Sequence, residues 1–522
     1  MSEIFKLELD TPAYKGGISF PTGLFIDGKF VKPVEQGKID VVNPSTGRVI
    51  TSVSVGTSKD VDIAVDAARK AYKTSWGLKV PGSVRGQMLL KLASLIEQNL
   101  DEFAALESLN VGKPFAVSKI ADIMSTVACL RYYGGWADKV HGKTIEVSCD
   151  PSNWRSSHAY VMNILKTNEN KLAYTRHEPY GVVGQIVPWN FPLSMASWKI
   201  GPALATGNCI ILKPSEITPL TALKLASLVN EAGFPPGVIN IVNGYGNTVG
   251  QSMAEHPHIS KVAFTGSTLT GRKIQEASAK SNLKVVTLEL GGKSPHIIFD
   301  DANLEQAVKW AVRGVFANGG QVCTAGSRIY LQEGIYDQFL QLFTEAAQNL
   351  SKNTGDPFGQ GVLHGPQASS MQLDRVMSYI DSAKTDGATI HFGGERHGTE
   401  GFFVKPTIFT DCRPEMKIVR EEIFGPCAAI IKFKTEEEVI EMANNTTYGL
   451  AAGVFTENSA RGIRMAHALE AGSTFINCYN TLDTAIPFGG YKQSGIGREL
   501  GEYALDTYTQ VKAVHVNLGM KL

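Results

Sequence analysis

Short apolar segments alternate with helical segments from Tyr174 to about residue 289, and this alternation restricts the fold more than any other feature. Each apolar segment has the length of a buried strand, and the segments between them have helical spacing. Such a sequence predicts a mostly parallel sheet, in which ligands bind at the carboxyl ends of the strands. The predicted strands are 180–188, 208–213, 237–244 and 261–265, and the predicted helices include 193–205 and 268–279.

The first 140 residues show other patterns. Residues 24–34 alternate apolar and polar side chains around Asp27-Gly28, which predicts a tight β-hairpin. Helical spacing begins behind Ser58, the expected N-cap. Another helix is expected over about 120–140, with its aromatic side chains in the core rather than in a binding site.

Length and charge limit the classes of function. A chain of 522 residues exceeds one ordinary hydrophobic core, so two or three domains are expected. The 50 basic residues equal the 50 acidic ones, without a basic block or an apolar stretch long enough to cross a bilayer. Nucleic acid and membrane partners are therefore not expected.

Cysteine usage and the start of the chain indicate the compartment. The seven cysteines are scattered, odd in number and without Cys-x-x-Cys spacing, which argues for a reducing compartment and against a metal site. The first ten residues have neither the apolar region of a secretory signal nor the Arg-rich character of a transit peptide. The expected location is cytoplasmic.

Cys323 lies among small residues over 314–328. The glycines at 319, 320 and 326 permit positive φ angles and leave room for a carbonyl carbon beside the sulfur. A reactive thiol would suit this setting. The alternative is an inert structural cysteine, which is the more common role of a free cysteine.

Polar residues follow two of the predicted strands. Lys213 and Glu216 come just after one strand, where an ammonium and a carboxylate could hold ribose hydroxyls. Gly266 and Ser267 open the next helix, whose N-terminal N–H groups would face a phosphate. The combination suggests a dinucleotide, although the usual Gly-x-Gly-x-x-Gly motif is missing. Alternatively, Lys213 and Glu216 form a surface ion pair worth under about 1 kcal/mol.

Glu289 lies between two leucines and before two glycines. A carboxylate in an apolar strand is costly unless it is paired or neutral. Burial would raise its pKa toward neutrality, which is what a residue that activates water requires. A solvent-facing glutamate at a strand end is the alternative.

Seven short motifs are spread in order over most of the chain. They are Pro188-Trp-Asn-Phe-Pro192, Lys213-Pro-Ser-Glu216, Phe264-Thr-Gly-Ser267, Leu288-Glu-Leu-Gly-Gly-Lys-Ser-Pro295, Gly320-Gln-Val-Cys323, Glu421-Glu-Ile-Phe424-Gly-Pro426 and Pro487-Phe-Gly-Gly-Tyr-Lys492. Together they resemble the NAD(P)-dependent aldehyde dehydrogenase superfamily, in particular its broad-specificity branch that converts simple aldehydes to acids. Each motif is weak alone, but seven in order make a chance match implausible.

The resemblance implies five catalytic positions. Cys323 matches the nucleophile that attacks the aldehyde carbon, with the Asn190 amide and the Cys323 backbone N–H holding the oxyanion. Transfer of hydride to the nicotinamide leaves a thioester. Glu289 matches the residue that activates water for its hydrolysis, and Lys199 and Glu499 match positions that support proton movement.

The resemblance also implies a cofactor site and a substrate tunnel. Glu216 favours NAD, since its charge would repel a 2′-phosphate, with NADP as a second cofactor that some members use. The cofactor positions are Trp189, Lys213, Glu216, Gly266, Ser267, Glu422 and Phe424, and the tunnel positions are Phe191, Trp198, Leu482 and Phe488. No metal is expected.

The implied architecture is α/β in three parts. A Rossmann-like NAD-binding domain is expected over 1–143 and 172–291, and an α/β catalytic domain over 292–492. Residues 144–171 and 507–522 would form a small β oligomerisation arm, as in homodimeric or homotetrameric relatives. Residues 149–170 are polar, unpatterned and inserted relative to typical members.

Two other readings remain open from the sequence. A CoA-acylating aldehyde dehydrogenase would share Cys323 and the cofactor, but such relatives generally lack the carboxylate at Glu289. A non-catalytic structural relative is the other, and the presence of Cys323, Glu289 and Asn190 argues against it.

Overall fold

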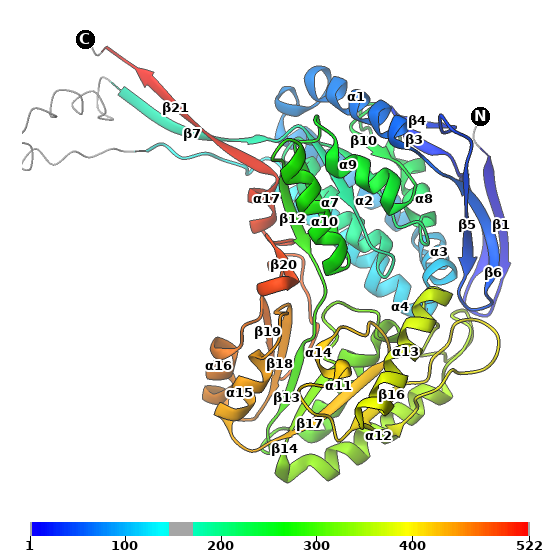
Figure 1. Ribbon diagram of the computed structural model, residues 1–522. Helices are drawn as coiled ribbons and strands as arrows, with labels where there is room; N and C mark the ends of the chain where they lie inside the picture. Colours follow the sequence, from blue (N-terminus) through cyan, green and yellow to red (C-terminus); the bar gives the residue numbers. More distant parts are fainter. Residues whose placement is uncertain (1–2, 146–170, 520–522) are drawn as a thin grey trace, which may run out of the picture.

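The computed structural model describes residues 3–145 and 171–519, and its chain forms two lobes that are each built around one β-sheet (Figure 1). The first lobe holds an eight-stranded sheet and the second a seven-stranded sheet. The segment between β12 (Val285–Glu289) and β13 (Pro295–Ile298) carries the chain from the first lobe to the second. The α/β fold class predicted from the sequence is confirmed.

The eight-stranded sheet has a parallel centre and antiparallel edges. β12, β11, β8, β9 and β10 run parallel, whereas β20 pairs antiparallel with β12, and β3 pairs antiparallel with both β10 and β4. The predicted hairpin around Asp27-Gly28 is confirmed as β3–β4. The bounds of the other strands are β20 Gly495–Ile496, β11 Lys261–Thr265, β8 Val182–Ile186, β9 Cys209–Lys213, β10 Ile239–Ile241, β3 Leu24–Ile26 and β4 Lys29–Val31.

The strand order places a topological switch point between β8 and β11. From β8 the chain adds β9 and β10 on one side and then returns to the other side of β8 with β11 and β12. Crossover connections leave in opposite directions at such a point, so a crevice opens outside the carboxyl ends of these two strands. The segment 187–191 follows β8 directly and therefore lies at this crevice.

Helices cover both faces of this sheet (Figure 1). The first helix is capped by Thr57 rather than by the expected Ser58, because Thr57 and Asp60 form a reciprocal capping box. The helix expected over 120–140 ends earlier and begins with a wider π turn, η2 (Ser118–Met124). The helices are α1 Ser58–Thr74, α2 Gly82–Gln98, α3 Leu100–Val111, α4 Phe115–Val117, α5 Ser125–Trp136, α7 Pro192–Ala205, α8 Leu220–Val229, α9 Gln251–Glu255, α10 Thr268–Ser281 and α17 Tyr503–Thr507.

The second sheet is parallel except for β15 at one edge. Successive strand residues point to opposite faces, so β13 sends Ile297 into one hydrophobic cluster and Ile298 into another. Burial on both faces explains why these strands are apolar throughout. The strands are β15 Thr389–Phe392, β16 Thr407–Thr410, β17 Cys427–Phe433, β14 Arg328–Gln332, β18 Ala451–Phe455 and β19 Ser473–Ile476, and the helices are α11 Leu304–Phe316, α12 Tyr336–Lys352, α13 Ser370–Asp386, α14 Lys417–Arg420, α15 Glu436–Asn444 and α16 Ser459–Ala468.

A two-stranded ribbon extends away from both lobes. It is formed by β7 (Lys171–Pro179) and β21 (Thr509–Asn517), which pair antiparallel over their whole length (Figure 1). Two further ribbons, β1–β2 (Ile4–Asp10 and Lys15–Pro21) and β5–β6 (Lys38–Asn43 and Arg48–Ser54), lie at the N-terminal side. The insertion inferred at 149–170 falls outside the described residues. In the described ranges, no helix combines the length and the apolar character that crossing a membrane demands.

Candidate active site

Cys323 lies in the loop between a distorted turn, η6 (Ala317–Gly320), and β14. Asn318, Gly319 and Gly320 have φ angles of 50°, 63° and 74°, so three successive residues adopt the left-handed conformation. A Cβ at Gly320 would lie 2.0 Å from the carbonyl oxygen of Gly425, which leaves no room for another residue there. The loop geometry therefore depends on the glycines that the sequence places before the half-buried cysteine.

Asn190 is brought to this loop from the switch point after β8. Its Nδ2 donates to the carbonyl oxygen of Gln321 at 2.9 Å, and its own carbonyl accepts from Asn318 Nδ2 at 3.1 Å. The Asn190 residue is buried, so both bonds are protected from water. The side-chain amide is thus fixed two residues from Cys323, where it can donate to an oxygen on a carbon bound to the sulfur.

Tyr479 supports the same loop from the opposite side. Its hydroxyl donates to the carbonyl oxygen of Thr324 at 2.8 Å. Its fully buried ring fits against Gly314 and Gly326, where a Cβ would lie 2.9 and 3.3 Å from ring atoms. This role could not be predicted from sequence, because an aromatic residue after a strand normally indicates only core packing.

Glu289 ends β12 and is buried, which decides between the buried and the solvent-facing positions that the sequence left open. Burial raises its pKa to about 8, and the Lys199 charge opposes that rise. Within the described residues, neither carboxyl oxygen has a hydrogen-bond partner. Burial, followed by the negative charges of Glu289 and Glu422, also raises the pKa of the Cys323 thiol well above its usual value. The thiol is therefore neutral until a base removes its proton.

Lys199 and Glu499 form a buried pair next to this carboxyl group. Lys199, on α7, donates to the Glu499 carboxylate and to the Thr265 hydroxyl, the latter at 2.7 Å. Thr265 ends β11 and is the Cα partner of Glu289 on β12. The second oxygen of Glu499 has no partner in the described part of the chain. The sequence analysis missed Thr265 as a member of this group, although the residue stands within the Phe-Thr-Gly-Ser motif.

Glu422 and Phe424 lie where the two lobes meet. Glu422 accepts the Gly292 N–H at 3.1 Å, and a Cβ at Gly291 would lie 2.3 Å from its carboxyl group. Burial raises the Glu422 pKa to about 7. The Phe424 ring packs edge-on against Trp189, with 5.2 Å between ring centroids. Trp189 and Asn190 are adjacent, so this aromatic pair lies beside the oxyanion position.

Lys213 and Glu216 lie at the carboxyl end of β9, next to β8. The Lys213 ammonium is buried and donates to Glu216 at 3.1 Å, while the Glu216 side chain is 34% exposed. Burial lowers the Lys213 pKa. This arrangement argues against the surface ion pair considered for the sequence, because the ammonium is not at the surface.

Gly266 and Ser267 join β11 to α10. The Gly266 N–H donates to the Glu289 carbonyl oxygen at 3.1 Å, and the Ser267 side chain caps α10 by accepting the Thr270 N–H. The start of a helix after Gly266 and Ser267, predicted from the sequence, is confirmed. The first turn of α10 consequently points its N–H groups toward the crevice at the carboxyl edge of the sheet.

Two of the four predicted tunnel residues are in direct contact. Trp198 and Phe488 pack edge-on with 5.2 Å between ring centroids. Phe191 immediately precedes α7, the helix that carries Trp198. Leu482 is 45% exposed, so it lies toward solvent.

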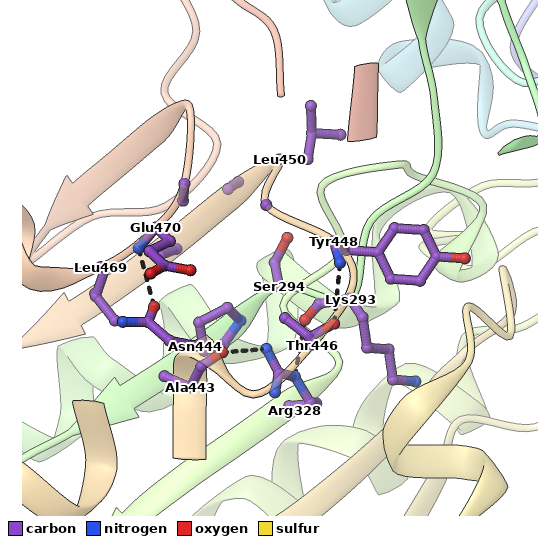
Figure 2. Close-up of a pocket in the computed structure, with 15 residues that line it drawn as sticks. Lys293, Ser294, Arg328, Ala443, Asn444, Thr446, Tyr448, Leu450, Leu469 and Glu470 are labelled. Carbon is purple, nitrogen blue, oxygen red and sulfur yellow. Dashed lines mark hydrogen bonds between the residues drawn. The ribbon is translucent and has the colours of Figure 1, made fainter. Parts of the chain in front are cut away.

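A separate, small pocket lies in the second lobe (Figure 2). Its wall includes Lys293 and Ser294, which lie just before β13, and Arg328, which begins β14. The guanidinium of Arg328 is already bonded to the carbonyl oxygen of Ala443, as Figure 2 shows. None of the predicted catalytic, cofactor or tunnel residues lines this pocket, so it is distinct from the candidate active site.

Comparisons with known proteins show the family of the chain. A sequence model described as the aldehyde dehydrogenase family matches residues 30–514. An aldehyde dehydrogenase of Agaricus bisporus is 58% identical over the full length of both chains, and the human mitochondrial aldehyde dehydrogenase is 48% identical over 96% of this chain and 93% of its own. An aldehyde dehydrogenase of Bacillus cereus, solved as an NAD⁺ complex, is 47% identical with a TM-score of 0.90, covering 95% of this chain and 97% of that one.

Proposed function

The chain belongs to the aldehyde dehydrogenase family and oxidises aldehydes with NAD, and we propose that the reaction proceeds through a covalent adduct on Cys323. The observation that carries this proposal is the convergence of three groups from distant parts of the chain. The nucleophile loop, the Asn190 amide and the buried Glu289 carboxyl group meet at the crevice between the two lobes.

The first step is attack of the Cys323 sulfur on the aldehyde carbon. Because burial keeps the thiol neutral, its proton must leave, and the nearby Glu289 carboxylate is the base that can take it. The carbonyl oxygen then becomes an oxyanion, held by Asn190 Nδ2 and by the Cys323 backbone N–H. One donor of this kind typically lowers a barrier by about 3 kcal/mol.

The residues at the carboxyl edge of the first sheet fit NAD. Lys213 and Glu216 offer a donor and an acceptor to ribose hydroxyls, and the first turn of α10 offers N–H groups to a phosphate. At this edge the buried Asn243 amide and the Oγ1 atom of half-buried Thr268 have no partner among the described residues. When bound, NAD supplies the hydride acceptor that converts the adduct on Cys323 into a thioester.

Hydrolysis of the thioester releases the carboxylic acid. The proton that Glu289 took from Cys323 must leave first, and the neighbouring Lys199–Glu499 pair, which also holds the Thr265 hydroxyl, can pass it onward. Glu289, with a pKa of about 8, then accepts a proton from the attacking water. That proton goes to the Cys323 sulfur as the carbon–sulfur bond breaks, so Cys323 returns to the thiol form.

We propose an apolar or aromatic aldehyde as substrate, because three of the four tunnel positions, Phe191, Trp198 and Phe488, are aromatic. The Glu216 carboxylate favours NAD over NADP, since a 2′-phosphate would place a second negative charge beside it. NADP remains a weaker second cofactor under this proposal.

We assign 1–143 and 172–291 to cofactor binding, 292–492 to the catalytic domain, and 144–171 with 507–522 to an oligomerisation arm. The β7–β21 ribbon supports the last assignment, because it extends away from both lobes and no other strand of the described residues pairs with the outer edge of β21. We propose a homodimer or homotetramer on this basis. A cytoplasmic location is proposed because the six described cysteines are free thiols.

NADH absorbance tests the proposed reaction. Reduction of NAD by aldehydes without CoA is expected, with aromatic aldehydes among the better substrates. Activity that depends on CoA would instead identify an acylating enzyme, in which CoA rather than water attacks the thioester. If the folded protein fails to reduce NAD with every aldehyde tested, both without and with CoA, the proposal is contradicted and a non-catalytic relative is favoured.

A further inference from the structure

Three ionisable residues are fully buried next to the tunnel residue Phe191 and have no role in the steps above. Glu107 lies on α3, Lys113 follows that helix, and Asp122 lies on η2. Their exposed fractions are 0%, 1% and 0%. The Lys113 ammonium donates to Asp122 at 2.6 Å. We call Glu107, Lys113 and Asp122 the buried triad.

The triad contacts the beginning of α7 at two points. Lys113 Nζ lies 3.8 Å from the centroid of the Phe191 ring, directly over its face. Glu107 Oε1 accepts the backbone N–H of Leu193 at 3.0 Å. Phe191 immediately precedes α7, and Leu193 is in its first turn, so the triad fixes both a side chain and the backbone at the place where the tunnel wall begins.

The charges of the triad balance when Glu107 is protonated. Burial, and then the charge of Asp122, raises the Glu107 pKa to about 8. Lys113 and Asp122 therefore form the ion pair, and Glu107 is a neutral hydrogen-bonding group at neutral pH. The remaining oxygens, Glu107 Oε2 and Asp122 Oδ2, have no partner within the described residues.

A buried ion pair is a poor means of stabilising a fold, because desolvation of two charges offsets most of their attraction. The burial of Lys113 is better explained by its effect on the orientation of the neighbouring Phe191 ring. An ammonium is attracted to the electron-rich face of an aromatic ring and not to its edge, so it selects one ring orientation. Apolar packing would hold the same ring less specifically.

We propose that Lys113 is a positioning residue that sets the size preference of the aldehyde tunnel by fixing the Phe191 ring. The inference rests on the proposed function, in which Phe191 forms part of the tunnel wall. With the ammonium removed, the ring gains other orientations and the wall loses its shape. Small aldehydes then bind less well, while bulky aldehydes can push the ring aside.

The test compares KM and kcat for acetaldehyde and for an aromatic aldehyde. In Lys113→Met/Asp122→Asn, which removes both charges together, KM for acetaldehyde is expected to rise about tenfold with kcat changed less than threefold. KM for the aromatic aldehyde should change less than threefold. The size preference is the ratio of KM for the aromatic aldehyde to KM for acetaldehyde. Lys113→Arg, which keeps a cation over the ring, should retain at least half of the wild-type ratio.

The matched control is Lys224→Met, because Lys224 is another largely buried lysine that pairs with an acidic residue of α3, Glu102, but has no aromatic partner. It should leave the preference unchanged. The proposal would be overturned if KM rose equally for both aldehydes in the double variant. It would also be overturned if Lys113→Arg had the same size preference as the double variant.

Phe191→Leu provides a test that leaves the triad intact. It should shift the preference in the same direction as the double variant, and an unchanged preference would reject the role of the ring. Failure of the proposed function is a different result, since the wild-type protein would then reduce no NAD with either aldehyde.

Discussion

The Tyr479 hydroxyl donates a 2.8 Å hydrogen bond to the carbonyl oxygen of Thr324, the residue that follows Cys323 in the chain. This contact joins the segment after β19 to the loop that carries the nucleophile, across 155 residues. The loop contains three successive left-handed residues and has little regular structure of its own. Its shape therefore depends on contacts of this kind.

Tyr479→Phe removes the hydrogen bond and keeps the ring. One buried hydrogen bond contributes about 1 kcal/mol, so we expect kcat/KM to fall about fivefold and alkylation of Cys323 by iodoacetamide to change in rate. Tyr330→Phe is the control, because its buried hydroxyl also donates to a carbonyl oxygen, that of Met442, away from the loop. Equal effects of both variants would mean that the Tyr479 bond acts only on stability.

Cys323→Ala should abolish aldehyde oxidation and retain NAD binding, since the cofactor residues belong to other elements. Binding can be followed by quenching of protein fluorescence on NAD titration. Cys478→Ala is the matched control, because Cys478 is another half-buried free cysteine. Turnover that survives in the Cys323 variant would refute the assigned nucleophile.

Glu289→Gln should slow hydrolysis of the thioester by about 10²–10⁴-fold, the usual contribution of a positioned general base. Burial raises the Glu289 pKa to about 8, and only its deprotonated form accepts a proton. The wild-type hydrolysis rate should therefore rise with pH and level off above about 8, and this rise should vanish in the variant. Single-turnover kinetics measure it, with the exposed Glu231→Gln as control.

Glu216→Gln removes the negative charge that disfavours NADP. A charge contact in partly exposed surroundings is worth about 1 kcal/mol, so the ratio of kcat/KM for NADP to that for NAD should rise about fivefold. The exposed Glu276→Gln should leave the ratio as it is. If this ratio is the same in both variants as in the wild type, Glu216 does not determine the preference for NAD over NADP.

Lys293→Met should stabilise the fold by about 1–3 kcal/mol, because the buried ammonium has no hydrogen-bond partner among the described residues. Burial lowers its pKa to about 7, below the value near 10.5 of an unfolded lysine. Between these two pKa values the unfolded chain therefore binds more protons than the folded one. The buried lysine lowers the free energy of unfolding most below pH 7, and this penalty shrinks toward pH 10.

Melting temperatures of the two proteins across this pH range measure the effect. Lys261→Met is the matched control, because Lys261 is equally buried with a pKa lowered to about 7 but donates to Thr287 at 2.9 Å. It should stabilise less or destabilise. A Lys293→Met protein that melts below the wild type at every pH would contradict the expectation.

Local patterns were sufficient for several features. The Asp27-Gly28 dipeptide predicted its hairpin, and Ser267 predicted the start of α10, because turns and caps are decided within about four residues. The two leucines beside Glu289 raised the possibility of a buried carboxyl group but did not decide it, because a glutamate at a strand end can also face solvent. The N-cap at Thr57 was missed by one residue, since Thr57 and Ser58 are both good caps and only the reciprocal bond with Asp60 distinguishes them.

The sequence by itself determined the alternation of strands and helices, the special glycines before Cys323, and the motifs that identify the family. Only the tertiary structure decided which distant side chains meet. Lys199 reaches Glu499 across 300 residues, and Lys113 lies over the Phe191 ring. Spacing along a chain reports contacts within one helix turn or one strand. Contacts between elements depend on how the whole core packs, and no local pattern encodes that.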